Sequence, residues 1–129
     1  MGNLVKNEIE SSEDSVTQFD PTEGNCYNYL NAMWLILQNK RCPFIDGQTY
    51  KRLTDCHTTT TPPGFKHWPV GPPISVGACL VQTPGTAPIY LINNGKKHHL
   101  TSWKGNISGN YVESIASYAL HCIPTGDPI

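Results

Sequence analysis

PIYLINNGKKHHL, at residues 88–100, is the stretch that decides the fold of this chain. Two short runs flank Asn94-Gly95, the dipeptide most typical of a two-residue hairpin loop. Both loop residues of a type I′ turn need positive φ, which Asn and Gly adopt most easily. The stretch therefore predicts a β-hairpin in which Leu91 lies opposite His98 and Tyr90 lies opposite His99.

An earlier stretch, MWLILQNKRCPFI at residues 33–45, follows the same pattern. At an offset of 55 positions Asn39 aligns with Asn94, and Arg41 aligns with Lys96. The segments WPVGPPI at 68–74 and IPTGDPI at 123–129 align at the same offset. The pattern predicts a tandem repeat, with an N-terminal arm at 1–20, one unit at 21–75 and a second unit at 76–129.

The expected fold class is mainly β with short helical turns, a small α+β fold. The 11 glycines and 11 prolines favour short strands and many turns. Because a two-stranded hairpin is marginal in water, we expect the two hairpin-centred units to share one core in a single compact domain. The residues expected there are Ile36, Ile45, Leu91 or Ile89, and Leu100, together with Trp34, Tyr90, Trp68 and Ile123.

Charge and hydropathy limit the partners. Residues 1–20 are acidic and polar, which indicates either a disordered arm or an arm that binds a partner. The remaining positive surplus is too weak for nucleic acid. The longest apolar run, Ala32–Leu37, is too short for membrane insertion, and no signal peptide is expected at the N-terminus.

Five cysteines, an odd number, leave two interpretations open. Two disulfides with one free thiol would suit a secreted protein, whereas five free thiols would suit a cytosolic one. We favour disulfides because small cores benefit most from cross-links. The candidates are Cys26, Cys42, Cys56, Cys79 and Cys122. The sequon at Asn106 offers a possible N-glycosylation site.

The hairpin YLINNGKK at residues 90–97 and the ending IPTGDPI at 123–129 resemble the tandem repeats of about 50 residues found in secreted and surface-attached bacterial proteins. The resemblance is clear over 77–129 and faint over 24–74. It implies an extracellular accessory module, and it implies no particular reaction.

No local pattern indicates catalysis, a cofactor or a metal. His98 and His99 are neighbours on an expected strand, so they point to opposite faces and cannot share one ion. Asp46 and Asp55 fit capping and turn roles better than general acid–base chemistry. We therefore expect no enzyme activity, although a small hydrolase that uses a cysteine or a histidine is a third alternative.

Aromatic and amide side chains suit sugar recognition, since aromatic rings stack on pyranoses while amides and lysines bind hydroxyls. The candidate ligand-binding residues are Trp103, Tyr50, Asn94, Lys96, Arg41 and Asn106. The sequence thus predicts a lectin-like, non-catalytic module that binds carbohydrate or a cell-surface polymer, outside the cell or at its surface. The alternative is a structural subunit of a homo-oligomer or fibre, with the acidic arm docked on a neighbour.

Overall fold

The computed structural model describes residues 21–56 and 61–129. The acidic arm at 1–20 lies outside the described residues, and so does the proposal that it docks on a neighbouring subunit. The chain forms a mainly β fold with a few short helices, as the sequence predicts. None of the helices in the described part of the chain is long and apolar enough to cross a membrane.

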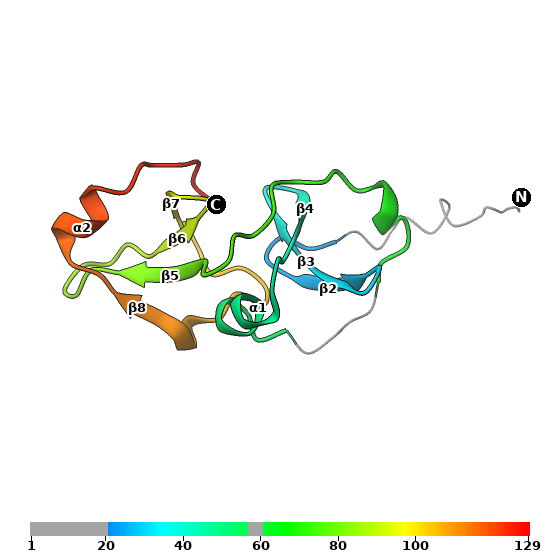
Figure 1. Cartoon of the computed structure of the whole chain (residues 1–129), viewed down its shortest axis with the longest axis horizontal. Coiled ribbons are helices and arrows are strands. Elements are labelled where there is room, and N and C mark those ends of the chain that lie inside the picture. Colours follow the sequence, from blue (N-terminus) through cyan, green and yellow to red (C-terminus); the bar gives the residue numbers. More distant parts are fainter. Residues whose placement is uncertain (1–20, 57–60) are drawn as a thin grey trace, which may run out of the picture.

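Two sheets lie side by side along the long axis of the molecule (Figure 1). An antiparallel sheet has the order β2-β3-β4, and a mixed sheet has the order β7-β6-β5-β8, in which β5 and β8 are parallel. The strands are β2 Cys26–Tyr29, β3 Ala32–Leu37, β4 Lys40–Pro43, β5 Cys79–Gln82, β6 Tyr90–Asn93, β7 Lys96–His99 and β8 Val112–Ser114.

The helices are short. They are α1 Gly47–Leu53, α2 Ser117–His121 and the 3₁₀ turns η2 Phe65–His67 and η3 Gly109–Tyr111. Asp46 caps α1, because its carboxylate accepts a hydrogen bond from the Thr49 backbone N–H at 3.2 Å, which confirms the predicted capping role.

The β6–β7 hairpin has the predicted turn and register. Asn94 and Gly95 have φ values of 53° and 76°, and the pairs Leu91–His98 and Tyr90–His99 face each other. The two positive φ values are those that a type I′ loop requires.

The β3–β4 hairpin differs from the prediction. The offset of 55 aligns Asn39 with Asn94, the first residue of the later turn, but the turn here consists of Gln38 and Asn39, with φ values of 51° and 64°. The Glu23 carboxylate accepts hydrogen bonds from both of their backbone N–H groups, at 2.6 and 3.0 Å. These bonds help to hold a tight loop that contains no glycine, and the return strand begins at Lys40 directly after it.

The two hairpins make matching contacts with the segments that follow them. Arg41 donates its backbone N–H to Pro69 O, as Lys97 does to Pro124 O, and both bonds measure 2.8 Å. Within the hairpins the matching positions are 56 residues apart, because the turns Gln38-Asn39 and Asn94-Gly95 coincide. Lys96 therefore corresponds to Lys40, not to Arg41 as the sequence alignment suggested.

Buried residues from both halves of the chain form one core cluster. Leu91 and Leu100 belong to it, and Ile36 is fully buried in a second cluster with Tyr27 and Phe65. The prediction for Ile45 is wrong, because its side chain is 59% exposed. The shorter turn shifts the strand, so Phe44 packs against the core and Ile45 points outward.

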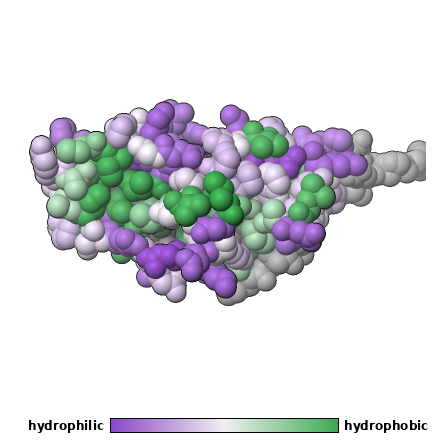
Figure 2. Space-filling view, in the orientation of Figure 1, coloured by the Kyte–Doolittle hydropathy of each residue, from purple (hydrophilic) through white to green (hydrophobic). Residues whose placement is uncertain are grey.

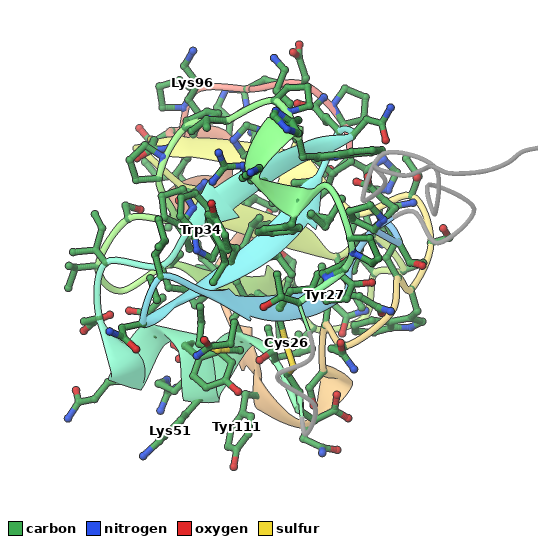
Figure 3. The ribbon with its side chains drawn as sticks, turned by 90° about the vertical axis from the view of Figure 1, so that its right-hand side faces the viewer. Cys26, Tyr27, Trp34, Lys51, Lys96 and Tyr111 are labelled. Carbon is green, nitrogen blue, oxygen red and sulfur yellow. A yellow bond between two sulfur atoms is a disulfide. The ribbon has the colours of Figure 1, made fainter. Side chains whose placement is uncertain are left out.

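An aromatic group on the three-stranded sheet surrounds Phe65, and Figure 3 labels two of its members, Tyr27 and Trp34. The Phe65 ring centroid lies 5.8 Å from that of Tyr27, 5.4 Å from that of Tyr29 and 6.2 Å from that of Trp34. The Tyr29 and Trp34 centroids are 6.3 Å apart. The Arg41 guanidinium lies 4.6 Å from the Trp34 ring centroid and donates through Nε to Trp68 O. These contacts give Arg41 a packing role on this sheet.

The cysteines form fewer bridges than expected. Cys26 on β2 is joined to Cys56, which follows α1, whereas Cys42, Cys79 and Cys122 are free thiols. The prediction of two disulfides is therefore wrong. The free cysteines sit on β4, on β5 and after α2, and only Cys42 among them is buried.

Candidate functional site

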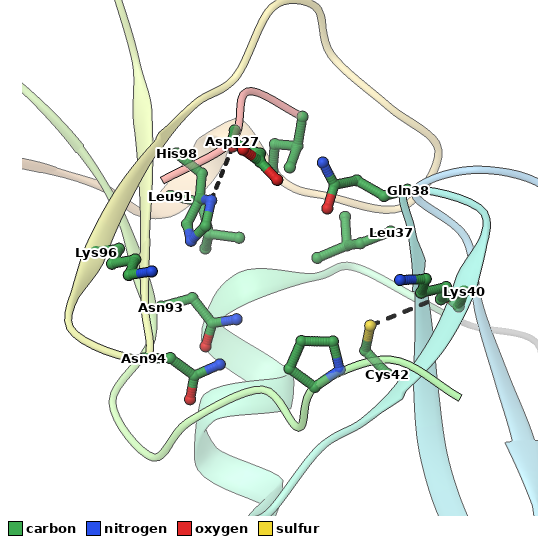
Figure 4. Close-up of a pocket in the computed structure, with 12 residues that line it drawn as sticks. Leu37, Gln38, Lys40, Cys42, Leu91, Asn93, Asn94, Lys96, His98 and Asp127 are labelled. Carbon is green, nitrogen blue, oxygen red and sulfur yellow. Dashed lines mark hydrogen bonds between the residues drawn. The ribbon is translucent and has the colours of Figure 1, made fainter. Parts of the chain in front are cut away.

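A cavity of about 500 Å³ opens between the β3–β4 and β6–β7 hairpins (Figure 4). We call it the hairpin cavity. Its residues come from both hairpins and from the segments that pack against them: Leu37, Gln38, Lys40, Cys42, Pro72, Leu91, Asn93, Asn94, Lys96, His98, Asp127 and Ile129. Cavities of this size hold small molecules or a few units of a polymer.

The cavity has an apolar floor. Leu37, Leu91 and Ile129 line it and are at most 9% exposed, and Cys42 adds a buried thiol. Burial raises the pKa of the Cys42 thiol to about 11. A catalytic cysteine needs the opposite shift, because the thiolate is the nucleophile. Cys42 is thus suited to packing rather than to nucleophilic attack.

Two lysines face each other across the cavity (Figure 4). Lys40 and Lys96 each occupy the first position after a hairpin turn, which brings one ammonium group from each sheet. In the part of the chain that the structure describes, neither ammonium forms an ion pair. The pair is available to an external acceptor.

Asn93 presents an oriented donor. Its side chain is 7% exposed, and its Oδ1 accepts hydrogen bonds from the Ser75 backbone N–H and from Ser75 Oγ at 2.8 and 2.9 Å. Because both partners donate, the oxygen must face Ser75, and the amide nitrogen projects into the cavity (Figure 4).

Three further groups at the rim each have one donor engaged. Asn94 donates Nδ2 to Pro73 O at 3.0 Å, and Gln38 donates Nε2 to Pro128 O at 3.3 Å. His98 Nδ1 lies 2.8 Å from Asp127 O, so a neutral His98 carries its proton on Nδ1. Each side chain keeps an acceptor for a ligand, and the Asp127 carboxylate adds another.

Trp103 lies in a different place. It lines a shallower groove of about 450 Å³ with Pro88 and His99, and it is 53% exposed. Because His98 and His99 alternate along β7, the groove and the hairpin cavity lie on opposite sides of that strand.

The structure brings together two of the candidate ligand-binding residues, Asn94 and Lys96. Tyr50 lies elsewhere, packed against Phe44 with its hydroxyl donating to Cys56 O at 3.2 Å. Asn106 Oδ1 accepts the Cys26 backbone N–H at 3.1 Å, so Asn106 connects the second half of the chain to β2. Arg41, packed on the aromatic group, does not line the cavity.

Sequence reasoning missed Lys40, Asn93, His98 and Asp127 as site residues. A signal for Lys40 was present, since an alignment of the hairpin turns rather than of identical residues pairs it with Lys96. Asn93 and Asp127 carry no such signal, because they reach the cavity through packing between distant segments.

Among the described residues, no group of three or more His, Cys, Asp or Glu side chains is arranged to hold a metal ion. Hydrophobic residues on the face shown in Figure 2 gather over the half that holds the four-stranded sheet, among polar residues. Comparison with family models, with curated proteins and with solved structures gave no match.

Proposed function

We propose that this chain is a non-catalytic binding module that holds a carbohydrate or a cell-surface polymer in the hairpin cavity. One observation carries the proposal: an apolar floor is surrounded by polar groups whose donors and acceptors are oriented by bonds to the protein itself. Sugars offer the same combination, with apolar C–H faces and many hydroxyls. Pre-oriented groups lose little entropy on binding, which favours recognition.

We also propose that the module consists of two copies of one hairpin unit. Support comes from the matching turns and from the matching bonds Ile74 N–Pro43 O and Ile129 N–His99 O, at 2.8 and 2.9 Å. In such a duplication the hairpin cavity lies between equivalent faces of the two copies, which explains why each contributes a lysine. An extracellular or surface location fits the Cys26–Cys56 disulfide.

The test is a glycan array of neutral and acidic oligosaccharides, followed by titration calorimetry of the strongest hit. Asp127→Ala removes a carboxylate acceptor from the rim, and its backbone carbonyl still holds His98. We expect affinity to fall about tenfold, since hydrogen bonds to charged groups contribute ~1.5–3 kcal/mol. Asp55→Ala, which removes an exposed carboxylate outside the cavity lining, should bind like the unaltered chain.

Two results would count against the proposal. An array without hits would contradict the proposal that the ligand is a carbohydrate. Equal affinity of Asp127→Ala and Asp55→Ala for a confirmed ligand would show that the ligand binds outside the hairpin cavity. In the second case Trp103→Ala would show whether the ligand occupies the groove beside β7 instead.

A further inference from the structure

The charges of the hairpin cavity are unbalanced. Lys40 and Lys96 bring two ammonium groups, and Asp127 is the one lining residue with a carboxylate side chain. An ammonium group that loses its hydrating water needs a hydrogen-bond acceptor in exchange. An acceptor with a negative charge stabilises two ammonium groups better than a neutral acceptor does. The cavity therefore favours a ligand that carries an anionic group.

The donors of the cavity come from two sides. The Lys40 and Lys96 ammonium groups lie on opposite walls, and the Asn93 amide nitrogen projects into the space between them (Figure 4). Asn93 is the most constrained of the three, because Ser75 fixes the opposite end of its amide. Together they offer two charged donors and one neutral donor to a ligand that fills this space.

The remaining polar groups act as acceptors. Asn94 and Gln38 each have one amide hydrogen bonded to a backbone carbonyl, which orients their carbonyl oxygens, and Asp127 is a carboxylate. These oxygens accept hydroxyl donors from the ligand. A densely charged anion would meet Asp127 unfavourably, so one acidic group on a hydroxyl-rich body fits better.

We propose that the ligand is an acidic sugar, whose carboxylate lies between Lys40 and Lys96 and whose hydroxyls donate to Gln38, Asn94 and Asp127. This inference rests on the proposed function, because it names the chemical class that the same cavity selects. It applies equally to a free sugar acid and to a uronate unit within a polymer.

The test compares matched ligands that differ in charge alone. Oligogalacturonate and oligoglucuronate are titrated into the full chain, and so are their methyl esters, in which the same carboxyl group is neutral. We expect at least one acid to bind about tenfold or more tightly than its ester. The preference should shrink as salt rises from 50 to 500 mM, because ions screen the exposed lysines.

Substitutions locate the effect. Lys40→Gln and Lys96→Gln should each remove most of the preference for the acid while leaving affinity for the ester unchanged. Lys51→Gln is the matched control, since Lys51 is an exposed lysine on α1, far from Lys96 in Figure 3. Circular dichroism of each variant confirms that the fold is retained.

The outcomes separate this inference from the proposed function. Equal binding of acid and ester, or binding of neutral array sugars alone, overturns the acidic-sugar assignment and leaves the binding module standing. Sodium acetate that competes at the same concentration as the oligosaccharide overturns it too, by showing a simple anion site. If no sugar of either kind binds, both proposals fail.

Discussion

Cys42 and His98 occupy matching positions in the β3–β4 and β6–β7 hairpins, although their side chains differ in chemistry. Each is the third residue of its strand and lies beside a glycine of the following segment. A Cβ added to Gly71 would lie 2.7 Å from Cys42 Sγ, and one added to Gly126 would lie 2.4 Å from the His98 ring. Both glycines are therefore required for space, so that the neighbouring side chain can reach the cavity.

The thiols provide a prediction at this scale. Burial raises the pKa of Cys42 to about 11 and also raises that of Cys79, whereas Cys122 is exposed. Because iodoacetamide reacts with thiolates, native protein at pH 8 should be labelled first at Cys122. Labelling of Cys42 should accelerate as pH rises toward 11, because the protonated form predominates below its pKa. Peptide mass spectrometry measures each rate.

The same reagent in denaturant gives the control. Three thiols should react when the disulfide is intact, and five after reduction, since Cys26 and Cys56 are bridged. One reactive thiol in the unreduced, denatured chain would instead restore the two-disulfide interpretation. Labelling of Cys42 as fast as that of Cys122 at pH 8 would contradict its burial.

At the scale of elements, the two hairpins show what sequence can and cannot predict. Asn94-Gly95 carries its turn preference locally, so the loop, the strands and the register of β6–β7 all follow from the residues themselves. Gln38-Asn39 lacks that preference, and the bonds that hold its loop come from Glu23, fifteen or more residues earlier. No local pattern reveals such a partner.

The residues of the candidate site also divide into those that a local pattern predicts and those that depend on distant contacts. Asn94 and Lys96 were predictable because they belong to the hairpin that the sequence identifies. Lys40 could be paired with Lys96 only once the turn was placed at Gln38-Asn39, one residue earlier than the alignment put it. Asn93 becomes a cavity donor through Ser75, a contact between segments 18 residues apart, and only the packed structure shows it.

The β3–β4 turn should accept a glycine at Asn39, because the matching position of the β6–β7 turn is Gly95. Asn39→Gly places glycine at φ 64°, where it carries no steric penalty, and retains the backbone N–H that Glu23 accepts. We expect a gain in the free energy of unfolding of roughly 0.5–1 kcal/mol. Gly95→Ala, at φ 76°, should lower it by a similar amount or more. Urea denaturation measures both changes.

These two substitutions control for each other, because each changes one turn and leaves the cavity lining intact. A loss of stability in Asn39→Gly would show that the asparagine side chain contributes more than its strained backbone costs.

At the scale of the whole molecule, the halves interlock rather than merely touch. Asn106, in the second half, donates its backbone N–H to Gly24 O and accepts from Asp55 N–H, both at 2.9 Å. Ser108 donates its N–H to Leu53 O at 3.0 Å. At a further point of contact, Gly77 N–H donates to Thr49 Oγ1 at 2.9 Å. A strand-like segment of one half thus completes the hydrogen bonding of the other.

This interlock predicts that neither half folds alone. Residues 21–75, expressed separately, would leave the Leu53 and Gly24 carbonyls without these partners and would expose core residues such as Leu35 and Leu37, which are 0% and 6% exposed in the whole chain. A small sheet without its packing partner is marginal in water. We expect narrow amide dispersion in the ¹H–¹⁵N spectrum of each fragment, 21–75 and 76–129, and one cooperative calorimetric transition for the full chain.

Mixing the fragments separates interlock from mere destabilisation. If the cross-half bonds supply the missing stability, the two fragments together should recover the dispersed spectrum of the full chain, at concentrations set by their affinity. A fragment 76–129 that is folded alone would contradict the interlock, since its 104–108 segment would need no partner. It would also place the hairpin cavity between two independent domains, so its lysines would no longer be held at a fixed separation.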